Sequence, residues 1–406
     1  MKLAAFTNPY RPGAGHMPPH LAGRKQEYEE FDRLLQQQTI LENMVLTGLR
    51  GVGKTVLLET FRPRAAAAGW LWVGTDLSES ASVSEANLAT RLIADLAVVT
   101  SSVQMEVHTP PQPGFSAGAE TQLVPVGFAV LASVYEQTPG LVSDKLKAVL
   151  EFAHVQLTNA GTGKIIFAYD EAQNLADNAG KAEFPLSVLL DVFQSIQRKE
   201  IPFMLVLTGL PTLFPKLVEA RTYAERMFRV VMLGRLNEEE SKEAILRPID
   251  VAGSPIHFHD ASVNVICRES GGYPYFIQFI CREVFDVFIQ QNAQGDVGPV
   301  PIDAIQRKLD TDFFAGRWAK VTDRQRQLMY VAASLRPEDE EFTIQEIVTR
   351  SAELLDKGFS ASHVNQILSG LSDHGLIYKN RFGKYSFAVP LLGTFILRSF
   401  DPMLQH

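Results

Sequence analysis

The chain has 406 residues, of which 46% are hydrophobic, so it is long enough for two or three domains with substantial cores. Its formal net charge of −8 excludes a protein whose whole surface is built to bind nucleic acid or an anionic membrane. A local basic patch remains compatible with this charge.

The cysteine content and the hydropathy of the sequence indicate in which cellular compartment the protein is expected. Cys267 and Cys281 are the only cysteines and lack the spacing of metal ligands, so we expect free thiols in a reducing environment. The amino terminus lacks the basic-then-apolar pattern of a secretory signal, and no uninterrupted apolar run approaches about 18 residues. These features predict a cytoplasmic protein without a membrane partner.

The first 43 residues predict a lead-in rather than a core element. Prolines at positions 9, 12, 18 and 19 stiffen the segment without making it a strand. A helix should follow, because Tyr28, Phe31, Leu34 and Leu35 share one helical face.

Residues 48–55 (GLRGVGKT) form a complete phosphate-binding loop. The apolar run 44–47 before it predicts a buried strand, and residues 56–61 predict the start of a helix. Backbone N–H groups in such a loop approach phosphate oxygens closely, and the following helix adds its positive end. The nucleotide-binding residues that we predict here are Gly48, Gly51, Val52, Gly53, Lys54, Thr55 and Val56.

Individual side chains of this loop have separate predicted roles. Lys54 should reach the β- and γ-phosphates, and the Thr55 hydroxyl should bind Mg²⁺. The sequence therefore predicts ATP or ADP as a ligand, with Mg²⁺ as the cofactor.

Residues 70–122, which follow the phosphate-binding loop and its helix, contain three segments of different character. Residues 70–74 predict a strand and residues 84–98 a helix. Residues 100–122 are rich in Ser, Thr, Pro, Gly and Gln, so we expect an exposed, poorly ordered loop or insertion there.

A second half of the nucleotide site is predicted at the end of the strand 165–170. Asp170 should bind the metal, and Glu171 should orient or deprotonate the attacking water. A helix at 184–199 and a strand at 202–208 follow. Alternating strands and helices predict an α/β fold with a parallel sheet covered on both faces, and the nucleotide at the carboxyl ends of its strands.

After residue 235 the pattern is helical, at 238–249, 261–269 and 275–290. A third unit follows, with helices at 323–335, 343–355 and 360–374 and strands at 376–379 and 384–388, which is the element order of a winged helix. We therefore predict a lead-in at 1–43, an ATPase core at 44–234, a helical lid at 235–300, and a linker with a winged-helix domain at 301–406.

With these motifs the chain resembles AAA+ ATPases of the origin-recognition type and the neighbouring STAND signalling ATPases. The resemblance rests on residues 18–24, 48–55, 169–171, 207–209, 224–229 and 233–236. It implies that Leu21 and Arg24 belong to a lead-in that closes over adenine. Thr208 matches the family's polar sensor of the γ-phosphate, with a simple strand-end hydroxyl as the alternative.

The resemblance also implies an arginine finger. Arg226 or Arg229 would complete a neighbouring subunit's site in a homo-oligomer, because a planar cation suits charge developing on the γ-phosphate. The alternative for either residue is a surface or intradomain salt bridge.

Residues 269–275 (ESGGYPY) depart from origin-recognition relatives, which usually place an arginine sensor near this helix start. The segment is more similar to the STAND Gly-x-Pro element, which implies that Gly272 and Pro274 lie near the nucleotide. The departure favours a slow nucleotide-dependent switch over fast hydrolysis by a ring.

The winged helix leaves two classes of partner open. From residue 320 onward, ten Lys and Arg are matched by ten Asp and Glu, and the third helix has neither Lys nor Arg. Lys379, Arg381 and Lys384 are concentrated in the wing, which suits weak contacts with DNA phosphates. One hypothesis is an ATP-dependent DNA-binding factor of replication, transposition or defence; the other is a signalling switch whose wing contacts a partner protein. Lys54, Asp170 and Glu171 argue against an inactive scaffold.

Overall fold

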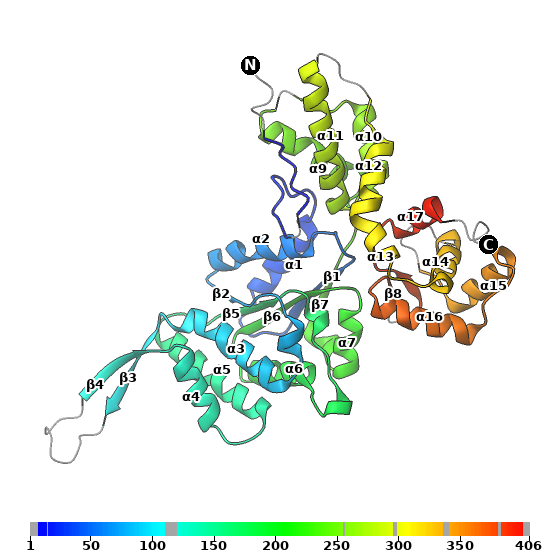
Figure 1. The fold of residues 1–406 in the computed structure, drawn as a ribbon. Helices are drawn as coiled ribbons and strands as arrows, with labels where there is room; N and C mark the ends of the chain where they lie inside the picture. Colours follow the sequence, from blue (N-terminus) through cyan, green and yellow to red (C-terminus); the bar gives the residue numbers. More distant parts are fainter. Residues whose placement is uncertain are drawn as a thin grey trace. The chain divides into compact units, whose positions relative to one another are not determined.

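The computed structural model describes residues 7–13, 15–109, 120–254, 256–294, 299–335, 341–380 and 383–400 (Figure 1). Contacts divide the chain into two compact units, neither of which is one continuous segment. The loop and wing unit contains Met1–Arg24, Gly48–Val56 and Leu233–His406, and the sheet unit contains Lys25–Thr47 and Leu57–Met232. The four sequence-based domain boundaries remain predictions.

A five-stranded sheet forms the core of the sheet unit. Its order is β2 (Leu71–Val73), β5 (Ile165–Tyr169), β6 (Phe203–Gly209), β1 (Asn43–Gly48) and β7 (Phe228–Leu233). The pairs β2–β5, β5–β6 and β1–β6 are parallel. All residues of β1, β5 and β6 are buried, as expected for parallel strands covered on both faces.

Helices cover both faces of this sheet (Figure 1). On one face lie α1 (Lys25–Leu35) and α2 (Lys54–Ala67), where the rings of Phe31 and Phe61 stack with centroids 4.1 Å apart. The opposite face packs against α3 (Glu85–Thr100), α5 (Val142–Asn159) and α6 (Pro185–Arg198). Two short helices, α7 (Leu213–Ala220) and α8 (Ala224–Met227), separate β6 from β7.

The prediction of a loop at residues 100–122 is wrong for the part that the structure describes. β3 (Gln104–Thr109) and β4 (Glu120–Pro125) form an antiparallel ladder, followed by α4 (Phe128–Gln137). In the ladder Met105 pairs with Val124 and Glu106 with Leu123. The pairing uses backbone N–H and C=O groups, so it forms despite the polar composition that led us to expect a loop. Residues 110–119 lie outside the described part of the chain.

Three helices form the lid in the loop and wing unit: α9 (Glu238–Val251), α10 (Asp260–Ser270) and α11 (Pro274–Gln294). Asn237 caps α9 through a reciprocal capping box with Glu240. The lead-in packs on this lid, because Tyr10 is 2% exposed, stacks on Phe258 and donates its hydroxyl hydrogen to the carbonyl oxygen of Ile245.

A helical linker joins the lid to the winged helix. It consists of α12 (Ile302–Leu309), the π-helical turn η5 (Asp310–Ala315) and α13 (Gly316–Trp318). The elements that follow are α14 (Asp323–Leu335), α15 (Ile344–Leu354), α16 (Ala361–Asp373), β8 (Ile377–Lys379), β9 (Tyr385–Phe387) and α17 (Leu392–Ser399). β8 and β9 are antiparallel, and Phe342 pairs with Tyr385.

The fold class predicted from the sequence is confirmed: a P-loop parallel sheet, a helical lid and a carboxyl-terminal winged helix. Both cysteines are free thiols, and Cys281 is buried. Within the described ranges, no helix combines the length and the apolar character that a membrane span requires.

Candidate functional site

Glycines shape the phosphate-binding loop. Gly51 and Gly53 have φ angles of +78° and +90°, in the left-handed region that other residues rarely adopt. A Cβ atom on Gly48 would lie 2.6 Å from the carbonyl oxygen of Leu233, so this position requires close backbone approach. The loop therefore has the conformation that the motif predicts, between β1 and the amino terminus of α2.

Lys54 begins α2 and folds back over the loop. Its Nζ donates hydrogen bonds to the carbonyl oxygens of Gly48, at 3.0 Å, and Leu49, at 2.9 Å. The ammonium group, the left-handed glycines and the first N–H groups of a 14-residue helix form a donor set that fits the phosphates of a nucleotide. Thr55 is the second residue of α2, where its hydroxyl suits Mg²⁺.

The amino terminus of α11 contacts this loop directly. The backbone N–H of Tyr275 donates a 3.1 Å hydrogen bond to the carbonyl oxygen of Gly51, and a Cβ atom on Gly51 would lie 3.1 Å from Cβ of Tyr275. Pro274 is the first residue of α11. Gly272 has a φ angle of +77°, and its Cβ position would lie 2.4 Å from the carbonyl oxygen of Leu236. The Gly-x-Pro element is thus next to the loop, and Tyr275 is the contact residue that the sequence did not indicate.

Tyr275 also joins the loop to the linker. Its ring centroid lies 5.2 Å from that of Phe313 in η5, and the guanidinium of Arg317 lies 4.5 Å above the Phe313 ring. Burial lowers the pKa of Arg317, and nearby Arg50 of the loop lowers it further. A continuous set of contacts therefore connects Gly51 with the segment that leads into the winged helix.

The lead-in holds the loop from the amino-terminal side. Arg24 is 7% exposed, and its Nη2 donates to the carbonyl oxygens of Val52, at 2.8 Å, and Gly234, at 3.1 Å. A Cβ atom on Gly15 would lie 3.5 Å from Cγ2 of Thr55. Leu21 is half-buried. Arg24 therefore supports the loop backbone, and contact of Leu21 or Arg24 with adenine remains a prediction.

Asp170 and Glu171 follow β5 in the sheet unit. Asp170 is 5% exposed and its Oδ1 accepts a 2.8 Å hydrogen bond from the backbone N–H of Glu171. Glu171 is exposed and has a φ angle of +50°, an unusual conformation for a residue other than glycine. Gln173 donates from Nε2 to Oε2 of Glu171. The turn thus buries one carboxylate and exposes the other, and the metal role of Asp170 and the water role of Glu171 remain predictions.

A hydrogen-bond network supports β5 immediately before this turn. The hydroxyl of Tyr169 donates to Oδ2 of Asp95 at 2.9 Å, and Arg91 forms a two-point ion pair with the same carboxylate. Burial raises the pKa of Tyr169 well above its ordinary value, and the Asp95 charge raises it further. Tyr169 therefore stays neutral and anchors the strand that carries Asp170.

Thr208 is fully buried near the end of β6, and among the described residues its hydroxyl has no hydrogen-bond partner. Leaving a buried hydroxyl unsatisfied costs about 1–3 kcal/mol, so a ligand oxygen would relieve a real deficit. Thr47 is also unpartnered among these residues. The register pairs Leu46 with Thr208, so the side chains of Thr47 and Thr208 point to opposite faces of the sheet.

The two finger candidates differ in their surroundings. Arg229 forms a two-point ion pair with Glu30, with both N–O distances 2.9 Å. Arg226 is exposed on α8, and its guanidinium has no partner within the described part of the chain. The salt-bridge alternative therefore applies to Arg229, and Arg226 is the better candidate for a finger.

The winged helix presents exposed, uncharged polar side chains on one of its helices. On α16 the exposed side chains include Asn365, Gln366 and Ser369. In the wing, Lys384 pairs with Glu341 at 3.5 Å, and Nζ of Lys379 lies 5.6 Å from the centroid of the Tyr385 ring. Arg381 lies outside the described residues. The positive charge predicted for the wing is thus partly neutralised by Glu341.

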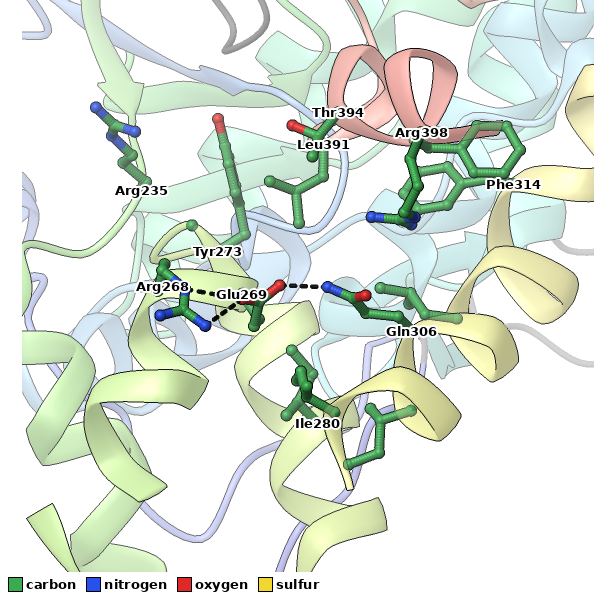
Figure 2. A pocket seen from close by; sticks show the side chains of 15 residues that line it. Arg235, Arg268, Glu269, Tyr273, Ile280, Gln306, Phe314, Leu391, Thr394 and Arg398 are labelled. Atoms are coloured by element: carbon green, nitrogen blue, oxygen red, sulfur yellow. Dashed lines mark hydrogen bonds and ion pairs between the residues drawn. The ribbon is translucent and has the colours of Figure 1, made fainter. Parts of the chain in front are cut away.

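A pocket of about 290 Å³ lies between the lid helices and α17 (Figure 2). Within it, Glu269 accepts hydrogen bonds from Arg268, at 2.8 Å, and Gln306, at 2.5 Å. On the α17 side, Leu391 approaches the lid so closely that a Cβ atom on Gly271 would lie 3.0 Å from its Cδ2. The winged helix therefore packs on the lid through apolar contacts around a hollow.

Solved structures that resemble this chain over nearly all of its length include those of two proteins, PABY2304 and ORC2. The Walker-type ATPase PABY2304 of Pyrococcus abyssi has a TM-score of 0.54 at 15% identity, covering 93% of this chain and 96% of that chain. The ADP form of ORC2 from Aeropyrum pernix has a TM-score of 0.52 at 12% identity, covering 96% and 97%. Its ADPNP–ADP complexes have a TM-score of 0.50, with the same identity and coverage.

At these identities the likeness shows the fold, and at that level the resemblance to origin-recognition-type AAA+ ATPases is confirmed. A family model described as a domain of unknown function (DUF8462) matches residues 311–396, which include the winged helix. No curated protein sequence matches the chain.

Proposed function

We propose that this chain, which has the fold of Walker-type and origin-recognition ATPases, is a slow ATP-hydrolysing switch that couples nucleotide state to its winged helix. The observation that carries the proposal is the loop of residues 48–55 itself, with its left-handed glycines and with Lys54 folded over it. The hydrogen bond from the backbone N–H of Tyr275 to the carbonyl oxygen of Gly51 supports coupling of this loop to the start of α11.

Binding would use the residues that the sequence predicts for phosphate and metal. The loop amides and Lys54 hold the phosphates, and Arg24 keeps the loop backbone in place through Val52. Thr55 and Asp170 supply oxygen ligands to Mg²⁺, which neutralises phosphate charge when bound. Gly272 and Pro274 fix the start of α11, so the lid responds to what the loop holds.

Hydrolysis would depend on Glu171. Its carboxylate accepts a proton from water as the water oxygen forms a bond to the γ-phosphorus. The bond from that phosphorus to the bridging oxygen breaks, and ADP leaves with the electron pair. Thr208, whose hydroxyl has no hydrogen-bond partner among the described residues, would donate a hydrogen bond to the γ-phosphate. The reaction yields ADP and inorganic phosphate.

The switch would act through the contacts that leave the loop. A change at Gly51 reaches Tyr275, then Phe313 of the π-helical turn and Arg317 behind it. Single π-turns inside helices often mark functional sites, and this one lies between the lid and the winged helix.

Two measurements on the native protein test this function together. Calorimetry should detect ATP binding in the presence of Mg²⁺, and phosphate release should show slow multiple turnover. Native protein that binds neither ATP nor ADP would refute the proposal. Binding without turnover would reduce it to a nucleotide sensor.

A second candidate function, an ATP-dependent DNA-binding factor, is favoured by one surface. The exposed Asn365, Gln366 and Ser369 occupy the face of α16 that would enter a groove, with Lys379 exposed in the wing beside it. Duplex affinity at low salt, with and without ATP, distinguishes this candidate from a wing that contacts protein.

A further inference from the structure

The side chain of Gln173 forms two hydrogen bonds within the sheet unit. Its Nε2 donates to Oε2 of Glu171, and its Oε1 accepts a 3.0 Å hydrogen bond from the backbone N–H of Leu210. Leu210 comes two residues after Thr208 and immediately follows β6. One amide group therefore joins the exposed carboxylate after β5 to the end of the neighbouring strand.

The fit around this amide is close. Oε1 of Gln173 would lie 2.5 Å from a Cβ atom on Gly209, so the glycine leaves room for the glutamine. The backbone carbonyl of Gln173 accepts a 2.9 Å hydrogen bond from Nζ of Lys216, a side chain whose pKa is lowered by burial. Side chain and backbone of Gln173 are thus both anchored to the segment that follows β6.

The rest of the turn is held independently of Gln173. The backbone N–H of Leu77 donates to the carbonyl oxygen of Asp170 at 2.9 Å, and Nδ2 of Asn174 donates to the carbonyl oxygen of Leu77 at 2.9 Å. These bonds fix the backbone on both sides of Glu171. Among the described residues, only Gln173 holds the Glu171 carboxylate by a hydrogen bond from another side chain.

We propose that Gln173 is a positioning residue for Glu171, and this inference rests on the proposed hydrolysis of ATP. By binding Oε2, the glutamine amide fixes the carboxylate plane and leaves Oε1 as the oxygen that accepts the proton from the attacking water. By binding Leu210 with its other end, it makes that orientation depend on the end of β6, which carries Thr208. Contact of Thr208 with the γ-phosphate is thereby linked to the orientation of the base.

Two substitutions that nearly preserve the size of the Gln173 side chain distinguish the effect of its hydrogen bonds from the effect of its packing. Gln173→Glu keeps the acceptor for Leu210 but replaces the donor facing Glu171 with a second carboxylate. Gln173→Met keeps the volume and removes both hydrogen bonds. Asn174→Ala is the matched control, because it loosens the same turn without touching the Glu171 carboxylate.

The measurements are the turnover number, the KM for ATP and the melting temperature. Both Gln173 variants should lose about 10- to 100-fold in turnover number with KM and ATP affinity near native values, because a misplaced base affects the chemical step. Asn174→Ala should retain most of its turnover. In a Glu171→Gln background, Gln173→Glu should cause no further loss, because the two residues act as one unit.

Turnover by both Gln173 variants at or above the native rate would overturn the positioning role and leave the proposed function intact. An equal loss in Asn174→Ala would overturn it too, since the loosened turn would then explain the effect. Absence of hydrolysis by native protein would instead remove the proposed function itself, and the positioning role with it. If Gln173→Glu does not fold, the turnover of Gln173→Met is compared with that of native protein and Asn174→Ala instead.

Discussion

The backbone N–H of Tyr275 donates a hydrogen bond to the carbonyl oxygen of Gly51, so the first turn of a lid helix is bonded to the phosphate-binding loop. The side chain of Tyr275 meanwhile packs on Phe313 in the linker. A single residue thus contacts the loop with its backbone and the route to the winged helix with its ring. The proposed coupling can therefore be tested by replacing the side chain of Tyr275, which leaves the backbone hydrogen bond in place.

Replacing Tyr275 with Ala should uncouple the linker from the nucleotide. The backbone bond to Gly51 survives, but the ring contact with Phe313 is lost, so ATP should still bind. Hydrogen exchange over residues 310–318 should change on addition of ATP in native protein and stay unchanged in Tyr275→Ala. Tyr135→Ala, in the sheet unit, is the control. An ATP response that persists in Tyr275→Ala would contradict the route through this ring.

The two carboxylates after β5 should have separable roles. Glu171→Gln should bind ATP within about threefold of native affinity. It should hydrolyse about 100-fold more slowly or worse, because the amide cannot accept the proton. Asp170→Asn should weaken the Mg²⁺ dependence of binding instead. Native turnover by Glu171→Gln would show that water activation is assigned to the wrong residue.

Arg226 should matter for hydrolysis only when subunits associate. Arg226→Ala and Lys54→Ala proteins should each be inactive, and a mixture should regain activity, because one protomer supplies the finger and the other the loop. Arg229→Ala breaks the ion pair with Glu30 and should mainly lower the melting temperature. Turnover per protomer that does not depend on concentration would argue against a shared site.

Substitutions at the wing should shift duplex affinity in opposite directions, depending on whether they remove a positive or a negative charge. Replacing Lys379, Arg381 and Lys384 with Ala should lower duplex affinity and reduce the slope of log affinity against log salt by about one unit for each lost phosphate contact. Glu341→Gln should raise affinity, because it removes the partner that neutralises Lys384. No duplex binding by native protein at low salt would exclude the DNA-binding factor and favour a protein-contacting wing.

Sequence patterns predicted the sheet and its site elements well because their signals are local. A buried parallel strand such as β5 is a continuous apolar run, and the loop of residues 48–55 has fixed spacing. By contrast, β7 was not predicted; it is an edge strand in which only the two end residues are buried and the four between them are half-buried or exposed. The β3–β4 ladder was missed because its pairing is carried by backbone groups.

The site residues that sequence reasoning missed depend on tertiary contacts. Nothing in the order of residues indicates that Gln173 bridges Glu171 to Leu210, or that Tyr275 meets Gly51. The difference between Arg226 and Arg229 follows from the position of Glu30, which is about two hundred residues away in the chain. The spacing of motif residues in the sequence indicates nucleotide chemistry. Tertiary packing determines which of the candidate side chains form contacts within the protein.

The central claim, that residues 48–55 bind nucleotide, is tested most directly by titrating Lys54→Ala with ATP. Hydrogen bonds to charged groups contribute about 1.5–3 kcal/mol, so the affinity should fall about 10- to 100-fold. The melting temperature should change little, because Lys54 is a half-buried polar residue at the first position of α2 and its replacement removes no apolar side chain from a core. Lys25→Ala, at an exposed position on α1, should bind ATP as native protein does. ATP affinity that is the same in Lys54→Ala and native protein would contradict the account.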